Sequence, residues 1–138
     1  MDGVLASSSA TERALHAVTG LRILIVEDEL IIALGAEMAL AENGHEVLGT
    51  ATTEDEAVEM ALATHPDVIL LDLRLANGGC GRRVAERVLA SIEVAIVFAS
   101  GNLTPDMQAR LTALHPAAMI GKPYFDAQLL RAVNEAVP

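Results

Sequence analysis

The sequence predicts a doubly wound α/β fold, in which a five-stranded parallel sheet in the order 2-1-3-4-5 is covered by helices on both faces. Two observations predict it. Short apolar segments alternate five times with helical patterns along the chain. The strongest of these segments are apolar at every position, which is typical of parallel strands buried on both faces. A length of 138 residues fits one such domain.

The regular pattern starts at Leu21, so the domain is expected to occupy residues 21–138. Residues 1–20 lack strong hydrophobic periodicity. They are expected to form an N-terminal extension, which is either a mobile tail or a short helix over 11–18.

The first strand–helix unit begins with a β-branched apolar run over 21–26, which predicts a strand. The helix after it has apolar residues at helical spacing, which mark its apolar face: Leu30, Ile31, Leu34, Met38 and Ala41. Asn43-Gly44 is a natural end for this helix. The more polar segment 46–48 predicts a short strand that suits an edge of the sheet.

The second helix has signals at both of its ends. Thr53 and Glu56 form a capping box at its start, and His65-Pro66 ends it. Its apolar face is expected to consist of Ala57, Val58, Ala61 and Leu62.

Two continuous apolar runs predict buried strands in the second half of the sheet. Residues 68–71 lead directly to Asp72, and residues 94–99 lead to Ser100-Gly101. Between them, a glycine-rich loop over 77–81 opens a helix. The apolar side of that helix is expected to hold Val84, Ala85, Val88 and Leu89.

The last two helices also have recognisable starts. Thr104-Pro105 predicts an N-cap and a first-turn proline for a helix that reaches about Leu114. Residues 117–120 predict the last strand, which is followed by Gly121-Lys122-Pro123. Asp126 is expected to cap the final helix. Its inward-facing residues are expected to be Leu129, Leu130, Val133 and Val137.

Polar residues directly follow four of the predicted strands, namely Glu27-Asp28, Asp72, Ser100 and Lys122. Because the carboxyl ends of parallel strands meet at one rim of the sheet, these side chains should gather there. Each residue alone has a structural explanation as a helix cap, a turn residue, a partner for a loop amide or a surface base. The set together predicts a functional site.

The chemistry of this set points to phosphoryl transfer. Two carboxylates 4 Å apart repel each other by ~4 kcal/mol at an effective dielectric constant of 20, so three at one rim would take up protons or need a cation. Mg²⁺ is a small, hard ion that is bound by oxygen atoms, and it meets that need. The Lys122 ammonium and the Ser100 hydroxyl suit phosphoryl oxygens, and Asp72 can itself be the nucleophile.

As an ordered set, these residues resemble the receiver domain of response regulators, over residues 21 to about 137. The resemblance implies a flavodoxin-like receiver fold and a response regulator of a two-component system. Such a protein accepts a phosphoryl group from a sensor histidine kinase. Asp72 looks like the phosphoacceptor, while Ser100 and Lys122 look like the groups that hold the phosphoryl oxygens.

The same resemblance implies a Mg²⁺ site. Asp28 looks like the direct ligand together with Asp72, and Glu27 like a ligand through water. The backbone carbonyl of Arg74 looks like a further ligand. Receivers use the positions of Arg74 and Asn102 to tune the lifetime of the phosphoryl group.

Two further features refine the resemblance. The run from Phe98 to Gly101 is similar to a receiver subgroup that ends strand 4 in Phe-Ala-Thr-Gly, with serine here in place of threonine. That subgroup is often paired with kinases of the HWE or HisKA2 type. The family prefers a small residue at the position of Gly101, which would give the phosphodonor room to approach. The family's Lys-Pro step is commonly cis, so Lys122-Pro123 is expected to be a cis peptide.

The chain also departs from the family. The usual Met-Pro step after the phosphoacceptor is replaced by residues 75–79, and the loop reaches Gly81 one residue later than usual. The aromatic switch residue of the family is Met119 here. We therefore expect the phosphorylation signal to pass through residues 102–114, with Gly101 as a hinge.

Three functions follow, in order of preference. No output domain follows the final helix, so a phosphorylated receiver would act on an unknown downstream protein or as a phosphoryl shuttle or sink, not as an enzyme. The alternative is a receiver-like interaction module that is not phosphorylated, although all five site residues are chemically competent. A flavin carrier comes last, because the acidic segment 27–29 would repel a phosphate.

Composition narrows the remaining possibilities. The formal net charge of −10 disfavours binding to nucleic acid or to an anionic membrane surface. No apolar run approaches the ~20 residues that cross a bilayer, and the N-terminus lacks a secretory signal. The single cysteine, Cys80, fits a reducing compartment. We expect a cytoplasmic protein that binds neither nucleic acid nor membrane.

Overall fold

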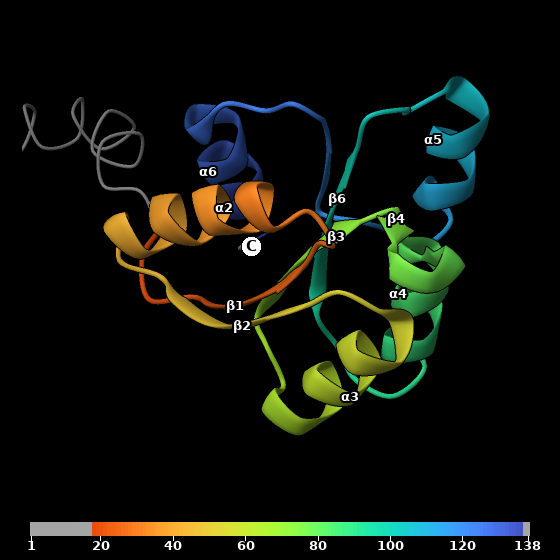
Figure 1. The fold of residues 1–138 in the computed structure, drawn as a ribbon, viewed down its shortest axis with the longest axis horizontal. Helices are drawn as coiled ribbons and strands as arrows, with labels where there is room; N and C mark the ends of the chain where they lie inside the picture. Colours follow the sequence, from red (N-terminus) through yellow and green to blue (C-terminus); the bar gives the residue numbers. More distant parts are fainter. Residues whose placement is uncertain (1–17, 137–138) are drawn as a thin grey trace, which may run out of the picture.

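The computed structural model describes residues 18–136 and shows the predicted doubly wound architecture (Figure 1). Five parallel strands lie in the order β2-β1-β3-β6-β7, which is the order 2-1-3-4-5 when the main strands are numbered along the chain. These strands are β1 (Arg22–Val26), β2 (Glu46–Ala51), β3 (Val68–Asp72), β6 (Ala95–Ser100) and β7 (Ala118–Gly121). The fold class predicted from the sequence is confirmed.

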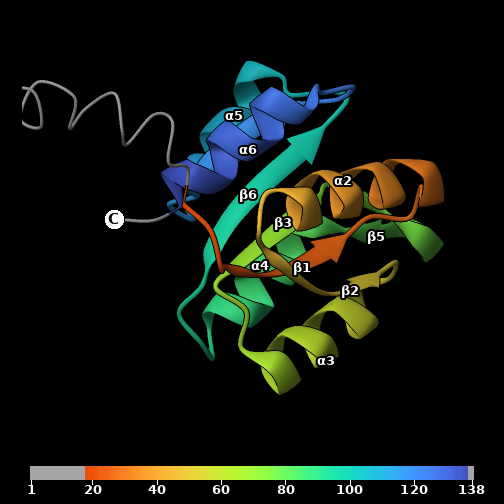
Figure 2. The same ribbon diagram turned by 90° about the vertical axis from the view of Figure 1, so that its left-hand side faces the viewer.

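Helices cover both faces of this sheet, as Figures 1 and 2 show from two directions. They are α2 (Leu30–Glu42), α3 (Glu54–Thr64), α4 (Gly81–Leu89), α5 (Pro105–Thr112) and α6 (Asp126–Glu135). Helices α2 and α6 pack on one face, where buried side chains such as Leu40 and Leu129 meet the sheet. Helices α3, α4 and α5 pack on the other, where Val84 and Leu111 are buried beside Phe98.

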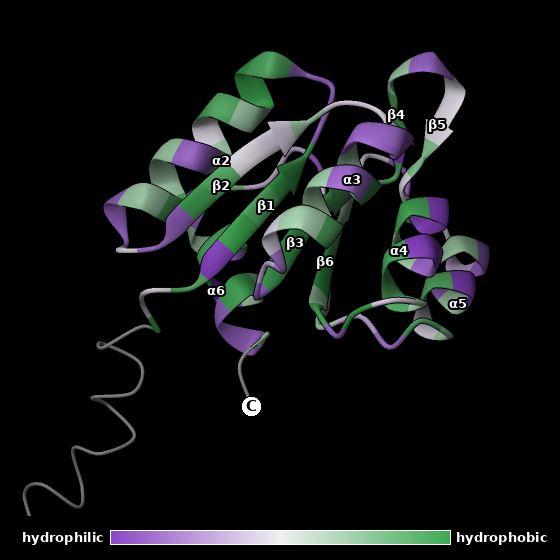
Figure 3. Cartoon of the chain, turned by 90° about the horizontal axis from the view of Figure 1, so that it is seen from below, coloured by the Kyte–Doolittle hydropathy of each residue, from purple (hydrophilic) through white to green (hydrophobic). Residues whose placement is uncertain are grey.

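The central strands are apolar along their whole length, as the colouring of β1, β3 and β6 in Figure 3 shows. All five residues of β3 are buried. This is the burial on both faces that the continuous apolar runs predicted. The strand boundaries agree with the prediction within a few residues, and the largest difference is β2, which continues to Ala51.

Local signals placed the helix ends well. The Thr53 hydroxyl accepts a hydrogen bond from the Glu56 N–H at 3.2 Å, and the Glu56 carboxylate accepts one from the Thr52 N–H at 2.8 Å. His65 ends α3 in a left-handed conformation. The Thr104 hydroxyl caps α5 by accepting from the N–H of residue 107 at 3.2 Å.

The predicted apolar face of α2 is wrong. Leu30 and Ile31 are 70% and 85% exposed, and Leu34, Met38 and Ala41 are also exposed. The buried face consists of Ala33, Ala36, Ala39 and Leu40. Three alanines let the helix lie close to the sheet, and the larger apolar residues on the other side have no core to enter. A helix that is apolar on all sides gives no periodic signal for its buried face.

Three smaller differences concern helix ends and faces. Leu62 of α3 is 38% exposed, whereas Met60 packs partly against the core. Asp126 is the first residue of α6 and not its cap, which is Phe125. Val137 and most of the suggested helix over 11–18 lie outside the described residues.

The glycine-rich segment after β3 forms a small hairpin, which the sequence did not predict. Strand β4 (Arg74–Leu75) pairs in antiparallel fashion with β5 (Gly79–Cys80). A 3₁₀ turn, η1 (Ala76–Gly78), joins them, with Asn77 and Gly78 at positive φ. Within residues 18–136, every helix is too short or too polar to cross a bilayer.

Candidate functional site

The ends of four parallel strands bring five polar side chains to one rim of the sheet. Glu27 and Asp28 directly follow β1, Asp72 ends β3, Ser100 ends β6 and Lys122 directly follows β7. Regular parallel ladders join these strands. The structure therefore brings together the set of side chains that the sequence placed at this rim.

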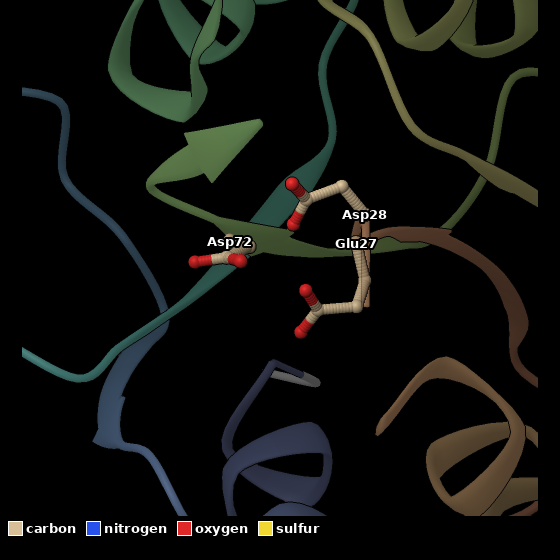
Figure 4. A group of neighbouring side chains, drawn as sticks. All are labelled: Glu27, Asp28 and Asp72. Atoms are coloured by element: carbon tan, nitrogen blue, oxygen red, sulfur yellow. The ribbon is translucent and has the colours of Figure 1, made fainter. Parts of the chain in front are cut away.

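Three carboxylates lie close together there. Figure 4 shows Glu27 and Asp28 from the segment after β1 and Asp72 from β3, with their carboxylates directed toward the same space. One oxygen atom from each residue lies within 4.8 Å of those of the other two. Glu27 and Asp72 are buried, whereas Asp28 is exposed. Negative charge at this density needs protons or cations nearby.

Lys122 supplies one positive charge to this group. Its Nζ lies 3.0 Å from Oδ2 of Asp72, 2.8 Å from Oε1 of Glu27 and 3.5 Å from Oε1 of Glu29. The Lys122 backbone N–H donates to the Ser100 carbonyl at 2.9 Å, which ties the segment after β7 to the end of β6. The Lys122–Pro123 peptide is cis, as predicted.

Burial and charge shift the protonation of two of these groups. Burial and a hydrogen bond with the Asp72 carboxyl raise the pKa of Glu27 to about 7, although Lys122 opposes the rise. Burial alone would lower the pKa of Lys122, but its hydrogen bonds to Glu27 and Asp72 outweigh this and raise it. One ammonium is therefore not enough to keep both buried carboxyls fully ionised at neutral pH.

A cavity of about 480 Å³ opens over Asp72. Ser100, Asn102 and Lys122 line it together with Arg74. The Ser100 hydroxyl accepts a hydrogen bond from the Asn102 N–H at 3.1 Å. A group that enters this cavity would meet a carboxylate, an ammonium and a hydroxyl at once.

Arg74 approaches the site through its backbone. Its N–H donates to Oδ1 of Asp72 at 3.2 Å, while the residue as a whole is exposed. Together with the Lys122 contact to Oδ2, this hydrogen bond fixes the orientation of the Asp72 carboxylate.

The donor set fits a hard divalent cation. Three carboxylates within reach of one point provide the oxygen ligands that Mg²⁺ prefers, and one of them is exposed, so water can complete the coordination. The raised pKa of Glu27 indicates that added positive charge would replace a proton at this rim. Glu27, Asp28 and Asp72 are the side chains that would hold such an ion.

Sequence reasoning left out two residues that contact or influence this group. Glu29, which follows the acidic pair, lies beside Lys122, and only its position next to Glu27 could have suggested this. Tyr124 is partly buried, and burial together with the negative charge of Glu27 raises its pKa to about 12. Its place two residues after Lys122 was the available signal.

Comparisons with known proteins agree with this arrangement. The model of the response regulator receiver domain family matches residues 23–134. The chain is similar to the phyllosphere-induced regulator PhyR of Methylorubrum extorquens, with 33% identity over 126 residues that form 91% of this chain and 46% of the relative. It is 29% identical over 119 residues to the transcriptional regulatory protein PdtaR of Mycobacterium tuberculosis, which covers 84% of this chain and 56% of the relative. This chain thus spans about half the length of both relatives.

Solved structures give the same result for the fold. The receiver domain of a modulated diguanylate cyclase from Desulfovibrio desulfuricans superimposes with a TM-score of 0.78 at 28% identity, covering 86% of this chain and 94% of that chain. The response regulator PhyR from Brucella abortus superimposes with a TM-score of 0.79 at 26% identity, covering 94% and 52% of the two chains.

Proposed function

Because this chain belongs to the response regulator receiver domain family, we propose that it accepts a phosphoryl group on Asp72 and signals through the resulting change in conformation. The observation that supports this most strongly is the position of Asp72. Its buried carboxylate lies at a cavity, with Lys122 on one oxygen and the Arg74 N–H on the other. This arrangement holds a nucleophile in one orientation and provides positive charge for an incoming phosphoryl group.

The transfer would proceed by attack of an Asp72 carboxylate oxygen on the phosphorus of a phosphohistidine in a sensor histidine kinase. A P–O bond forms as the P–N bond breaks, and the imidazole nitrogen leaves and takes up a proton. Lys122 and the Ser100 hydroxyl would hold the phosphoryl oxygens, because both line the cavity beside Asp72. Hydrolysis by water at the same site would end the signal.

Asp28, Asp72 and the backbone carbonyl of Arg74 would bind Mg²⁺ directly, and Glu27 would bind it through water. The ion would supply positive charge that offsets the negative charge of the carboxylates and of the transferred group. Exposure of Asp28 at the cavity rim suits a site that keeps some of its water ligands.

A kinase of the HWE or HisKA2 type is the proposed donor, because of the Phe-Ala-Ser-Gly run at the end of β6. The phosphorylated protein would act on a downstream protein or pass the phosphoryl group on. Since sensor kinases draw on ATP, we place this exchange in the cytoplasm.

The test compares the wild type with Asp72→Asn in phosphotransfer from a labelled kinase, with Mg²⁺ or with a chelator. Base-labile labelling of the wild type that needs Mg²⁺ and is lost in Asp72→Asn is the expected result. Asp55→Asn is the matched control, because Asp55 is 91% exposed in its side chain and pairs with Arg87 on α4. Undiminished labelling of Asp72→Asn would exclude Asp72 as the acceptor.

A further inference from the structure

The hairpin of residues 74–80 begins and ends against the backbone of the proposed phosphoacceptor. It leaves β3 next to Asp72 and returns at Gly81, whose N–H donates to the Leu73 carbonyl at 3.0 Å. A Cβ atom at Gly81 would overlap the carbonyl oxygen of Asp72. Any displacement of the hairpin is therefore transmitted directly to Asp72 and to its neighbour Arg74.

The outer strand of this hairpin is held by a residue from a different helix. Oε2 of Glu54, the first residue of α3, accepts a hydrogen bond from the Cys80 backbone N–H at 2.7 Å. The same oxygen accepts two more from the Arg83 guanidinium, at 2.9 Å from Nε and 2.6 Å from the terminal nitrogen. The Glu54 side chain is only 17% exposed.

Electrostatics explains why a carboxylate suits this position. Arg83 lies in the first turn of α4, where the positive end of the helix dipole disfavours a cation. Glu54 compensates for that charge and places a negative group at the start of the helix. Its hydrogen bonds with Arg83, and with the Cys80 N–H, lower the pKa of Glu54, so the carboxylate stays charged at neutral pH.

The hairpin needs such support, because an isolated pair of two-residue strands is not stable in water. Its other anchor is a hydrogen bond from the Ala76 N–H to the Thr52 carbonyl at 3.0 Å. Cys80 is the residue that pairs with Arg74 across the hairpin. Glu54 therefore holds the strand that lies directly beside Arg74.

We infer that Glu54 is a positioning residue: by holding Cys80 and Arg83, it fixes the hairpin so that the backbone carbonyl of Arg74 stays in place for the metal ion beside Asp72. This inference rests on the proposed function. Glu54 itself contacts neither the metal site nor the phosphoryl group. It acts through Cys80 and then through Arg74.

The test compares Glu54→Ala, Glu54→Gln and Asp55→Asn by following backbone amide shifts during titration with Mg²⁺. Asp55→Asn is matched, because it removes the neighbouring carboxylate and its ion pair with Arg87 but leaves the hairpin alone. We expect Glu54→Ala to weaken Mg²⁺ binding by about 10-fold, as is typical for residues that orient metal ligands. Glu54→Gln should have a smaller effect, because its amide oxygen still accepts from Cys80. Asp55→Asn should bind like the wild type.

Hydrogen exchange provides a second measurement that does not need the metal. Glu54→Ala should speed exchange of the Cys80 amide and of other amides in residues 74–80, while amides of β1 and β6 keep their protection. A Mg²⁺ affinity in Glu54→Ala equal to that of the wild type would overturn the inference. If the wild type itself binds no Mg²⁺, the proposed metal site fails instead, and unchanged exchange at Cys80 would then overturn the positioning role separately.

Discussion

The ammonium group of Lys122 donates a hydrogen bond to the carboxylate of Asp72, with 3.0 Å between Nζ and Oδ2, although 50 residues separate them in the sequence. The same nitrogen lies 2.8 Å from Glu27. One largely buried cation is therefore shared by two buried carboxyls, and both depend on it for charge compensation.

Replacing Lys122 with Gln should make the stability of the protein depend on Mg²⁺. Without divalent ions, we expect the free energy of unfolding to fall by roughly 3 kcal/mol, because Glu27 and Asp72 would be left buried without a cation. Excess Mg²⁺ should restore much of this loss by binding the same carboxylates. Urea unfolding with and without Mg²⁺ measures both effects. Arg87→Gln, at an exposed ion pair, should change stability by less than about 1 kcal/mol in either condition. An equal loss for Lys122→Gln in both conditions would contradict the expectation.

Two glycine substitutions should have opposite effects on stability. A methyl group at Gly81 would overlap the Asp72 carbonyl oxygen, so Gly81→Ala should cost roughly 1–3 kcal/mol and disturb the phosphoacceptor. At Gly35, within α2, no heavy atom of the described chain lies within 4 Å of the new methyl group. Gly35→Ala should therefore stabilise the helix by about 0.5–1 kcal/mol. Thermal or urea unfolding of both variants would show whether the signs differ as expected.

The fold was predictable from the sequence because its determinants are local. Continuous apolar runs such as 68–71 can only be strands buried on both faces, and capping residues such as Thr53 and Thr104 mark helix starts without knowledge of the rest of the chain. The convergence of Asp72 and Lys122 then follows from the topology of a parallel sheet, which brings the carboxyl ends of its strands together.

What the sequence could not predict depends on contacts between distant segments. The hairpin after Asp72 is held by Glu54, which lies 26 residues before Cys80, and no local pattern joins the two. The buried face of α2 was also beyond sequence reasoning. Leu34 and Ala36 are both apolar, and only the close approach of the helix to the sheet selects the alanine for the core.

His45 should make the protein less stable in mild acid. Its Nδ1 accepts a hydrogen bond from the Leu21 N–H at 3.2 Å, and burial lowers its pKa below the usual 6.5. Because the unfolded chain binds a proton at higher pH than the folded chain does, the stability from neutral His45 is present above pH ~6.5 and is lost as the pH falls through the folded pKa. This one group changes the free energy of unfolding by no more than about 1.4 kcal/mol per pH unit.

Urea unfolding between about pH 7.5 and 5.5 measures this effect. Subtracting the same curve for His45→Gln removes the contributions of all other titrating groups. His65→Gln is the control at an exposed helix end, and it should keep the pH dependence of the wild type. If His45→Gln keeps it as well, another group is responsible.

The phosphorylation signal should pass through α5 and not through β7. Met119 pairs with Phe98 across β6 and β7, and it has neither an aromatic ring to turn nor a hydroxyl to exchange partners. By contrast, the Ser100 hydroxyl is bonded to the Asn102 N–H, which starts the segment leading to α5. Within the described part of the chain, Leu111 is the one buried residue of α5, so little apolar contact opposes a movement of this helix.

A phosphoryl group held by Ser100 would draw its hydroxyl away from Asn102 and free the start of that segment. Addition of beryllofluoride with Mg²⁺ should therefore shift the amides of residues 102–112 strongly and those of 118–121 weakly. Ser100→Ala lacks the hydroxyl, so its amides at 102–112 should respond much less to the same addition, whereas Met119→Leu should respond like the wild type. Large shifts confined to 118–121, with 102–112 silent, would show that strand β7 transmits the signal despite its methionine. The two outcomes differ because only the first requires the hydrogen bond between Ser100 and Asn102 to break.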